Sequence, residues 1–332
     1  MPPAPTWQGM PIEIKEFFVS YLDFKSRLRL RACSKTDMSL VDACPVSLDK
    51  LAFCMGSSRR QRENRLEIKE GAKSTEFYRN NIDRFFKILK PRNSFVQNLT
   101  LFWDWTTHAD ENVARNEARK RKLLSKLDTI PKIQARGVYF LADGFSDEEF
   151  LRIFQMIDPQ ELRTLHLFPD LSAELQEKLI ATESWKMART MVFYSRQDIR
   201  MDALLHFDLL HYYVHNLSAG DSWKLIDSFR TKKTPMVGYG FRVNTLCQLS
   251  EHQIVSAFKI ASEKVPNPEA SRDPAKHSYL FRTYADGLVL VVRIRRTDHR
   301  ALEIEAYICT EENAHQEFER FVCQTLLEHF LE

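Results

Sequence analysis

The chain has 332 residues, 44% of them hydrophobic and 28% charged, and its 48 basic and 45 acidic side chains leave a formal net charge of +3. This near balance argues against a dedicated nucleic-acid binder, whose domain is normally clearly basic. No window approaches the roughly 18 consecutive apolar residues of a membrane span, and nine glycines are too few to favour a Rossmann or P-loop enzyme.

The first 45 residues contain two short apolar segments. A helix is predicted near Pro11, because proline is favoured in the first turn and apolar side chains follow at the spacing of one helix face. These side chains are Ile14, Phe17, Phe18, Tyr21 and Leu22. So short a segment cannot bury that surface by itself, and we expect something else to cover it.

A repeating pattern follows from about residue 48. Short strands are predicted at residues 48–53, 96–101, 135–140, 162–167, 188–193 and 209–214. Helices are predicted at 146–157, where Ser146 and Glu149 form a capping box, at 172–187, and after Ser218 and Ser250. From residue 135 to 209 the strands start 27, 26 and 21 residues apart, within the leucine-rich-repeat range of roughly 20–29. The fold class predicted is therefore α/β: an irregular leucine-rich-repeat-like curved stack with a parallel sheet and helices outside.

The C-terminal part departs from this repeat. A β-hairpin is predicted at residues 279–294 and a third alternating strand at 302–308. A final apolar helix from Glu312 is expected to cap the open end of the stack. The proline-containing segment 264–276 is predicted to be a flexible loop.

The N-terminal segment resembles an F-box over residues 7–48. Trp7, Met10-Pro11-x-Glu13-Ile14, Tyr21-Leu22, the segment 27–35 and Leu40-Val41 carry the resemblance. The family's helices dock on a Skp-type adaptor, which links them to a cullin and to a ubiquitin-conjugating enzyme. By the family's pattern the residues buried at that interface are Met10, Pro11, Ile14, Phe18, Leu22, Leu28, Leu30 and Cys33. Without the resemblance, the apolar pattern alone would favour a helical cap folded onto the repeat stack, and this is the alternative to adaptor docking.

A second resemblance is to the FTH domain that accompanies the F-box in a nematode-expanded family. It rests on Trp185-Lys186-x-Ala188-Arg189, Leu205-His206-Phe207 and Val214-x-Asn216-Leu217-Ser218-x-x-Asp221, in that order. The two resemblances imply an F-box over residues 1–50 and a leucine-rich-repeat-like FTH domain, binding a protein substrate, over 51–332.

The implied function is that of a non-enzymatic substrate receptor of an SCF ubiquitin ligase, which bridges the adaptor to a protein destined for degradation. Matching of one receptor to a single harmful protein, an antidote-like role, is a further hypothesis. A cullin-independent scaffold or inhibitor, and a hydrolase, stay open as alternatives. The chain shows no nucleophile elbow, H-E-x-x-H motif or paired-carboxylate pattern, although catalytic groups can also assemble in space.

Other parts of the sequence contain further candidate site residues. Trp103 and Trp105 follow a predicted strand, and because tryptophan is favoured at binding hot spots they are candidate substrate contacts, with core packing as an equal competitor. His206, His211 and His215 lack the further ligands of a structural metal site. The basic runs 58–65 and 119–122 are interpreted as solvated faces, with a nuclear-localisation signal, a phosphate-binding patch or binding of an acidic substrate as the alternatives. No metal, cofactor, nucleic acid or membrane partner is expected. The six cysteines show no C-x-x-C pair, and with no secretory signal they favour the cytoplasm or nucleus.

Overall fold

The computed structural model describes residues 6–56, 65–78, 81–91, 93–104, 110–142, 144–168, 171–194, 199–246, 249–258, 263–265, 277–296 and 301–315. The chain divides into two compact units. The first comprises Met1–Pro169 and Ala181–Met187, and the second comprises Asp170–Ile180 and Ala188–Glu332.

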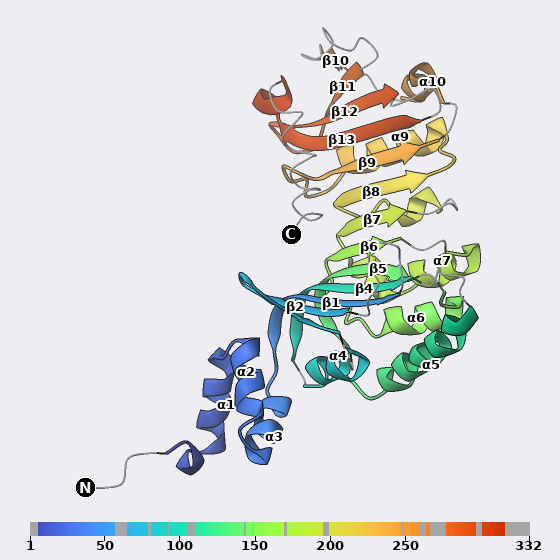
Figure 1. Ribbon diagram of the computed structural model, residues 1–332. Coiled ribbons are helices and arrows are strands. Elements are labelled where there is room, and N and C mark those ends of the chain that lie inside the picture. The colour runs from blue at the N-terminus through green and yellow to red at the C-terminus, as the bar shows by residue number, and fades with distance from the viewer. Residues whose placement is uncertain are drawn as a thin grey trace. The chain divides into compact units, whose positions relative to one another are not determined.

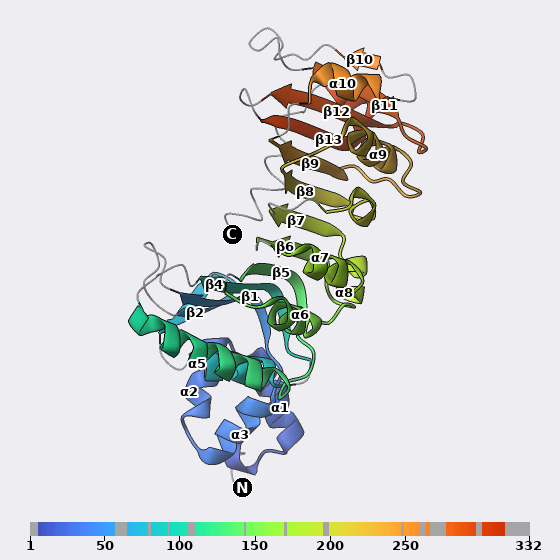
Figure 2. The same ribbon diagram turned by 90° about the vertical axis from the view of Figure 1, so that its right-hand side faces the viewer.

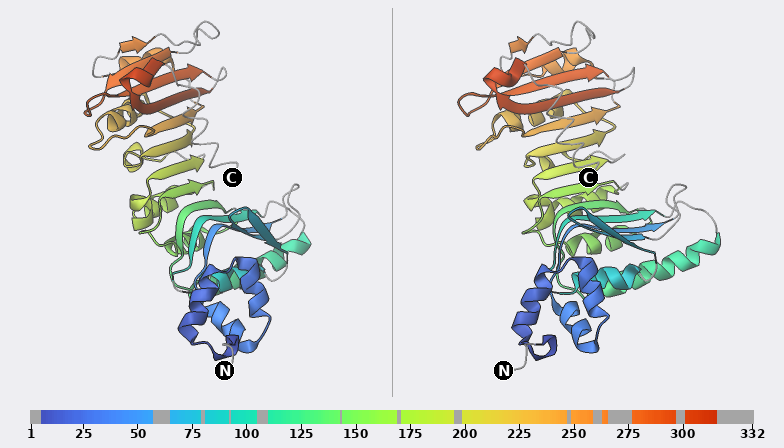
Figure 3. Two further views of the ribbon diagram at one scale, coloured as in Figure 1. Left: turned by 90° about the vertical axis from the view of Figure 1, so that its left-hand side faces the viewer. Right: turned by 60° about the vertical axis from the view of Figure 1, so that its left-hand side comes forward.

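The first unit begins with a small helical bundle (Figures 1 and 3). It consists of the 3₁₀ turn η1 (Trp7–Gly9) and the helices α1 (Ile12–Tyr21), α2 (Phe24–Arg31) and α3 (Lys35–Ala43). Asp23 and Ser34 cap α2 and α3 by accepting a hydrogen bond from the backbone N–H three residues later. The core of the bundle is small, and its members are Val19, Leu40, Val41 and Cys44, with Trp7 and Leu30 packed against them.

A buried arginine ties the three helices together. Arg27 is 7% exposed, and its guanidinium donates to the carbonyl oxygens of Ser20 (3.2 Å), Leu22 (3.0 Å) and Pro45 (2.7 Å). Ser20 and Leu22 lie at the end of α1, and Pro45 follows α3, so one side chain joins the ends of two helices to the middle of α2. A buried charge is tolerated when it is hydrogen-bonded in this way.

The sheet of the first unit follows directly. Its strands are β1 (Ser47–Gly56), β2 (Arg65–Glu70), β3 (Lys73–Phe77), β4 (Phe95–Asp104), β5 (Gln134–Ala142) and β6 (Thr164–Leu167), in the order β6-β5-β4-β1-β2-β3. The first four of that order are parallel, whereas β2 and β3 form an antiparallel hairpin beside β1. The register aligns a row of fully buried side chains across the parallel strands: Leu51, Leu99, Val138 and Leu165.

Helices cover one face of this sheet. They are α4 (Asn81–Leu89), α5 (Asp110–Leu127) and α6 (Asp147–Gln155), and they lie side by side (Figure 1). A further helix of the unit is α8 (Glu183–Met187). Aromatic rings fill the space between sheet and helices: Phe53 lies 5.0 Å from Phe85 and Phe140 lies 5.3 Å from Phe150, measured between ring centroids.

The second unit has its own mixed sheet. The strands are β7 (Thr190–Tyr194), β8 (Leu209–Val214), β9 (Gly240–Thr245), β10 (Glu263–Val265), β11 (His277–Arg282), β12 (Leu288–Arg296) and β13 (Leu302–Thr310), in the order β7-β8-β9-β13-β12-β11-β10. β7, β8 and β9 are parallel and the remaining neighbours are antiparallel. The other elements are α7 (Ala173–Ile180), η2 (Met201–Ala203), α9 (Ala219–Arg230), α10 (Glu251–Ser256) and η3 (Glu311–His315). α9 lies against the sheet (Figure 2). It packs there through Phe229, which contacts Phe241, and through Trp223, which contacts Phe281.

The α/β fold class predicted from the sequence is confirmed. The six predicted strands correspond to β1, β4, β5, β6, β7 and β8, and the hairpin and third strand correspond to β11, β12 and β13. The capping box at Ser146 begins α6, Ser218 caps α9 and Ser250 caps α10. The predicted domain boundary at residue 50 falls within β1, and α1, α2 and α3 belong to the same compact unit as β1 to β6.

Other predictions are corrected or lie outside the described residues. The helix predicted at 172–187 is two helices, α7 and α8, because Thr182 accepts a hydrogen bond from the Trp185 backbone N–H and starts a new helix. β2, β3 and β9 were not predicted. Of the predicted loop 264–276, the first two residues belong to β10, and the remainder lies outside the described residues. The final helix lies outside them too, apart from the few residues that form η3. None of the helices in the described ranges combines the length and apolarity needed to cross a bilayer.

Candidate protein interface on the N-terminal helices

Helix α1 presents an apolar face to solvent. Ile14 is 45% exposed, Phe18 48% and Tyr21 76%, and Ile12 and Phe17 are exposed too. Positions 14, 17, 18 and 21 have the i, i+3, i+4, i+7 spacing of one helix face. The rings of Phe17 and Tyr21 contact each other at 4.9 Å, so they form a continuous surface. Contiguous apolar surface of this kind marks interaction sites in proteins.

The opposite side of α1 holds the helix in the bundle. Val19 is fully buried against Leu40, Val41 and Cys44. The same helix therefore has one face that is covered from within the chain and one that is not. Ile14 and Phe18, which a cap folded onto the stack would enclose, are about half exposed.

The residues implied by the family's pattern occupy different environments. Pro11, Ile14, Phe18 and Cys33 are exposed, and Met10, Leu22, Leu28 and Leu30 are partly buried. Leu30 packs inward on the small core of the bundle, and Leu28 faces a groove beside α4. The structure thus brings Ile14 and Phe18 together on one face but directs Leu30 elsewhere. Contact of these eight residues with an adaptor stays a prediction.

Four exposed apolar residues of the bundle were not among those eight: Ile12, Phe17, Tyr21 and Met38. Phe17 and Tyr21 were already in the predicted apolar stripe of the first helix. The signal that could have added them to the site is helical periodicity, since they continue the face that Ile14 and Phe18 begin.

A polar network fixes the start of the bundle. The Trp7 indole N–H donates to Asp37 Oδ1 (2.7 Å), and the Ser34 hydroxyl donates to Asp37 Oδ2 (2.7 Å). The bond from Trp7, followed by that from Ser34, lowers the pKa of Asp37 below its usual value. Asp37 therefore stays ionised at neutral pH and anchors η1 to α3.

The bundle is also joined to the scaffold of the first unit. The Phe24 backbone N–H donates to Glu70 Oε2 on β2 (2.7 Å), and Asp23 pairs with Lys73 on β3. On the other side, Asp42 of α3 accepts from Lys87 of α4 at 3.1 Å. These contacts lie on both sides of the bundle. They fix the bundle, and with it the exposed face of α1, to the sheet and α4.

The tryptophan candidates lie elsewhere. Trp103 is 3% exposed and its ring contacts Phe53 (6.2 Å) and Phe145 (4.8 Å), as a core residue does. Trp105 lies outside the described residues. Substrate contact by Trp103 or Trp105 stays a prediction.

The charged and metal-ligating candidates form no metal site in the described part of the chain. Within the described ranges no group of three or more His, Cys, Asp or Glu side chains is placed to hold a metal ion. His211 is buried, and burial followed by the charge of Arg242 lowers its pKa to about 4. In the basic run 119–122, Lys120 is buried and pairs with Glu117 and Glu149. Most of the run 58–65 lies outside the described residues.

Comparison with known families assigns two domains to the chain. The model of the F-box domain matches residues 7–48, which cover η1, α1, α2 and α3 and end at the start of β1. The model of the FTH domain matches residues 121–260, from the end of α5 to just past α10. No relative among curated proteins matches the chain.

Proposed function

The chain is an F-box protein with an FTH domain, and from this premise we propose that it is the substrate-recognition subunit of an SCF ubiquitin ligase. F-box domains in general bind Skp-type adaptors, and F-box proteins in general are non-catalytic components of these ligases. The proposal adds that this chain delivers a protein substrate, bound through its FTH domain, for ubiquitination and degradation in the cytoplasm or nucleus.

The observation that carries the proposal is the uncovered apolar face of α1. It lies inside the F-box match, and its exposed side chains come from one helix, which Val19 anchors in the core of the bundle. A protein interface needs such a desolvated apolar centre with few ions in it.

The catalytic contribution under this proposal is positional. A receptor that holds a substrate in the same complex as the conjugating enzyme raises the effective concentration of substrate lysines near it. The α3–β1 connection supports this role, because the bundle and the scaffold of the first unit are joined by hydrogen bonds and ion pairs as well as by the chain.

A pull-down with a purified Skp-type adaptor tests the proposal. The variant Ile14→Asp/Phe18→Asp places two charges on the apolar face, and we expect adaptor affinity to fall by about 100-fold, as for two buried hot-spot residues. Both side chains are about half exposed, so the fold should tolerate the change. The matched control is Met236→Asp/Val237→Asp, which alters two equally exposed apolar residues of the second unit and should leave adaptor binding unchanged.

The same material can be analysed for cullin and substrate. Cells with the proteasome blocked should yield cullin and at least one enriched protein with the wild type, and should lose cullin with the Ile14→Asp/Phe18→Asp variant. No adaptor binding by the wild type, or equal binding by the variant, would refute the receptor proposal. Adaptor binding without cullin would favour a cullin-independent scaffold or inhibitor instead.

A further inference from the structure

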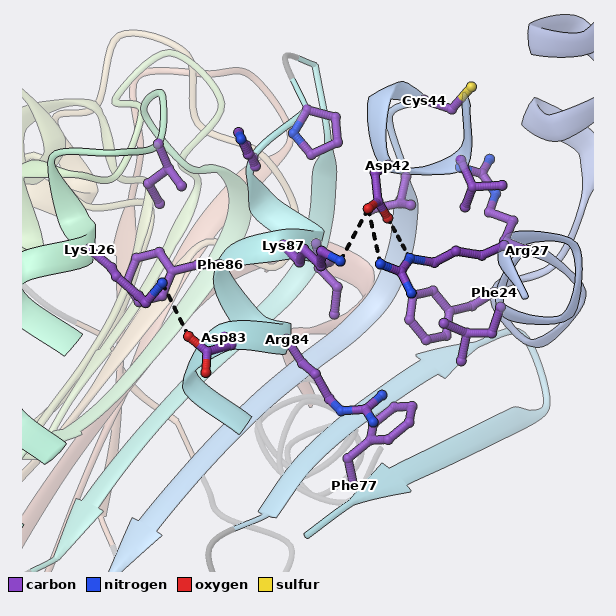
Figure 4. A pocket seen from close by; sticks show the side chains of 18 of the residues that line it. Phe24, Arg27, Asp42, Cys44, Phe77, Asp83, Arg84, Phe86, Lys87 and Lys126 are labelled. Carbon is purple, nitrogen blue, oxygen red and sulfur yellow. Dashed lines mark hydrogen bonds and ion pairs between the residues drawn. The ribbon is translucent and has the colours of Figure 1, made fainter. Parts of the chain in front are cut away.

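A groove of about 650 Å³ lies between the F-box helices and α4. One wall consists of residues of α2 and α3, and the other consists of residues of α4 together with the ends of β3 and α5. Figure 4 shows its lining side chains. α4 lies outside both family matches, since it falls between residues 48 and 121. The groove is thus a feature of the joint between domains and is distinct from the apolar face of α1.

The floor of the groove is apolar. It is formed by large side chains from both walls: Phe24, Leu28, Phe77, Phe86 and Ile130. A cavity of this size accommodates one or two large side chains of a ligand, within the usual range for binding pockets.

The rim of the groove carries more cations than anions. The lining cations are Arg27, Arg31, Arg84, Lys87, Lys90 and Lys126, whereas the lining carboxylates are Asp42 and Asp83. Arg27 is occupied by three backbone carbonyls. The other five cations outnumber the two carboxylates. The lining therefore has a net positive charge even when Arg27 is left out.

Each carboxylate is shared by two cations. Asp42 accepts from Arg31 at 2.7 Å and from Lys87 at 3.1 Å. Burial tends to raise the pKa of Asp42, but the bonds from Arg31 and Lys87 outweigh it and the net shift is downward. Asp83 in the same way serves Lys126 at 3.1 Å and Lys122 at 2.6 Å. Both carboxylates are therefore ionised and fully engaged.

Two rim cations have no carboxylate at all among the residues that the structure describes. Arg84 is exposed and its guanidinium stacks on the Phe77 ring at 4.4 Å (Figure 4). Lys90 is exposed just after α4. The end of a helix favours nearby cations, which accounts for Lys87 and Lys90. It also accounts for Arg31 and Lys126, which lie in the last turns of α2 and α5, but not for Arg84 near the start of α4.

We propose that this groove binds an acidic segment of a protein partner, with a large apolar side chain on the floor and carboxylates at Arg84 and Lys90. Charge complementarity identifies the segment as acidic, since the rim supplies unpaired cations. The apolar floor favours a protein segment over duplex nucleic acid, whose binding is dominated by phosphate contacts. A single strand, whose bases can stack on aromatic rings, is an outcome of the test below. The site goes beyond the proposed adaptor docking, shares with the predicted adaptor residues only Leu28, and does not depend on that docking.

A binding titration with the full chain tests this proposal. The probe is a fluorescent synthetic peptide with a central Leu-Phe pair flanked by glutamates, compared with the same peptide carrying glutamines. We expect the glutamate peptide to bind more tightly and to weaken as salt is raised. Arg84→Glu/Lys90→Glu should weaken it by about ten-fold or more, because two attractions become two repulsions. Arg136→Glu/Lys233→Glu, which reverses two exposed cations outside the groove, should leave the affinity unchanged.

Further arms separate the alternatives. The Ile14→Asp/Phe18→Asp variant should keep peptide binding, so failure of the adaptor proposal does not decide this one. Equal affinity for the glutamate and glutamine peptides would overturn the groove proposal, as would equal binding by the Arg84→Glu/Lys90→Glu variant. Loss of adaptor binding in the latter variant would assign the groove to the adaptor and overturn it as a separate site. Preference for a single-stranded oligonucleotide that the same variant abolishes would overturn it too.

Discussion

Replacement of Arg27 by methionine tests what holds the F-box helices together. The guanidinium is 7% exposed and donates to three backbone carbonyls, at 2.7, 3.0 and 3.2 Å. Methionine fills similar space but donates nothing, so the carbonyls of Ser20, Leu22 and Pro45 lose their partner. α1 would then lose its connection to the segment after α3.

The magnitude follows from two opposing contributions. A hydrogen bond to a charged group contributes roughly 1.5–3 kcal/mol, and three are lost. Against this, burial lowers the pKa of Arg27, which shows that holding the charge inside has a cost that methionine removes. We expect a net loss of about 3 kcal/mol in the free energy that keeps the helical bundle closed. Arg27→Lys should lose about half of that, because a compact ammonium cannot span three carbonyls as a planar fork does.

Hydrogen exchange of the full chain, read by mass spectrometry, measures this locally. Amides of α1 and α2 should exchange roughly 100-fold faster in Arg27→Met, since each 1.4 kcal/mol corresponds to about ten-fold. Amides of β8 and β9 in the second unit should be unchanged. Arg29→Met, at an exposed position of the same helix, is the control and should have little effect. Exchange within three-fold of wild type in Arg27→Met would refute the reasoning.

Two other predictions concern the second unit. Gly240→Ala should lower its free energy of unfolding by roughly 1–3 kcal/mol in urea titrations, because the added Cβ would clash with the Ala306 carbonyl oxygen of β13. Gly220→Ala on α9, where the added Cβ would meet the Ser218 hydroxyl oxygen at an ordinary contact distance of 3.7 Å, should instead stabilise it by about 0.5–1 kcal/mol. Acidification should destabilise this unit through His211, whose pKa is held near 4 while the unfolded chain takes up its proton near 6.5. The unfolding free energy should therefore fall by about 2 kcal/mol between pH 7.5 and pH 5, and an equal fall in His211→Gln would contradict this assignment.

Strand positions could be predicted from the sequence because burial imposes a regular pattern. In β1, β4 and β5 the same position of each strand is buried, and Leu51, Leu99 and Val138 align in the sheet. Helix starts could also be predicted where a serine caps the first turn, as Ser146 does for α6.

The missed elements lacked these signals. β2 and β3 form the hairpin at one end of the strand order of the first unit, and their many charged side chains conceal the alternation. β9 begins at Gly240, whose lack of a side chain allows close approach of β13; a glycine there reads locally as a turn. The break between α7 and α8 depends on Thr182, whose hydroxyl could equally have pointed outward from a continuous helix.

The candidate interface could be predicted in part, because its apolar residues follow the helical period. Periodicity identified the apolar stripe of α1, but it could not tell which residues of α2 face inward. Leu30 turns to the core of the bundle and Leu28 to the groove, although they are only two positions apart. The excess of cations at the groove could not be predicted, because Arg31, Arg84 and Lys126 come from three separate helices.

The short connection from α3 to β1 has a mechanical consequence. α3 ends at Ala43 and β1 begins at Ser47, and contacts from Asp23 to Lys73 and from Asp42 to Lys87 brace the two sides of that short connection. A force or torque applied to α1 is therefore transmitted to the first strand of the sheet. A flexible linker between the helices and the sheet would not transmit it. A partner bound to the N-terminal helices therefore also fixes the orientation of the rest of the first unit.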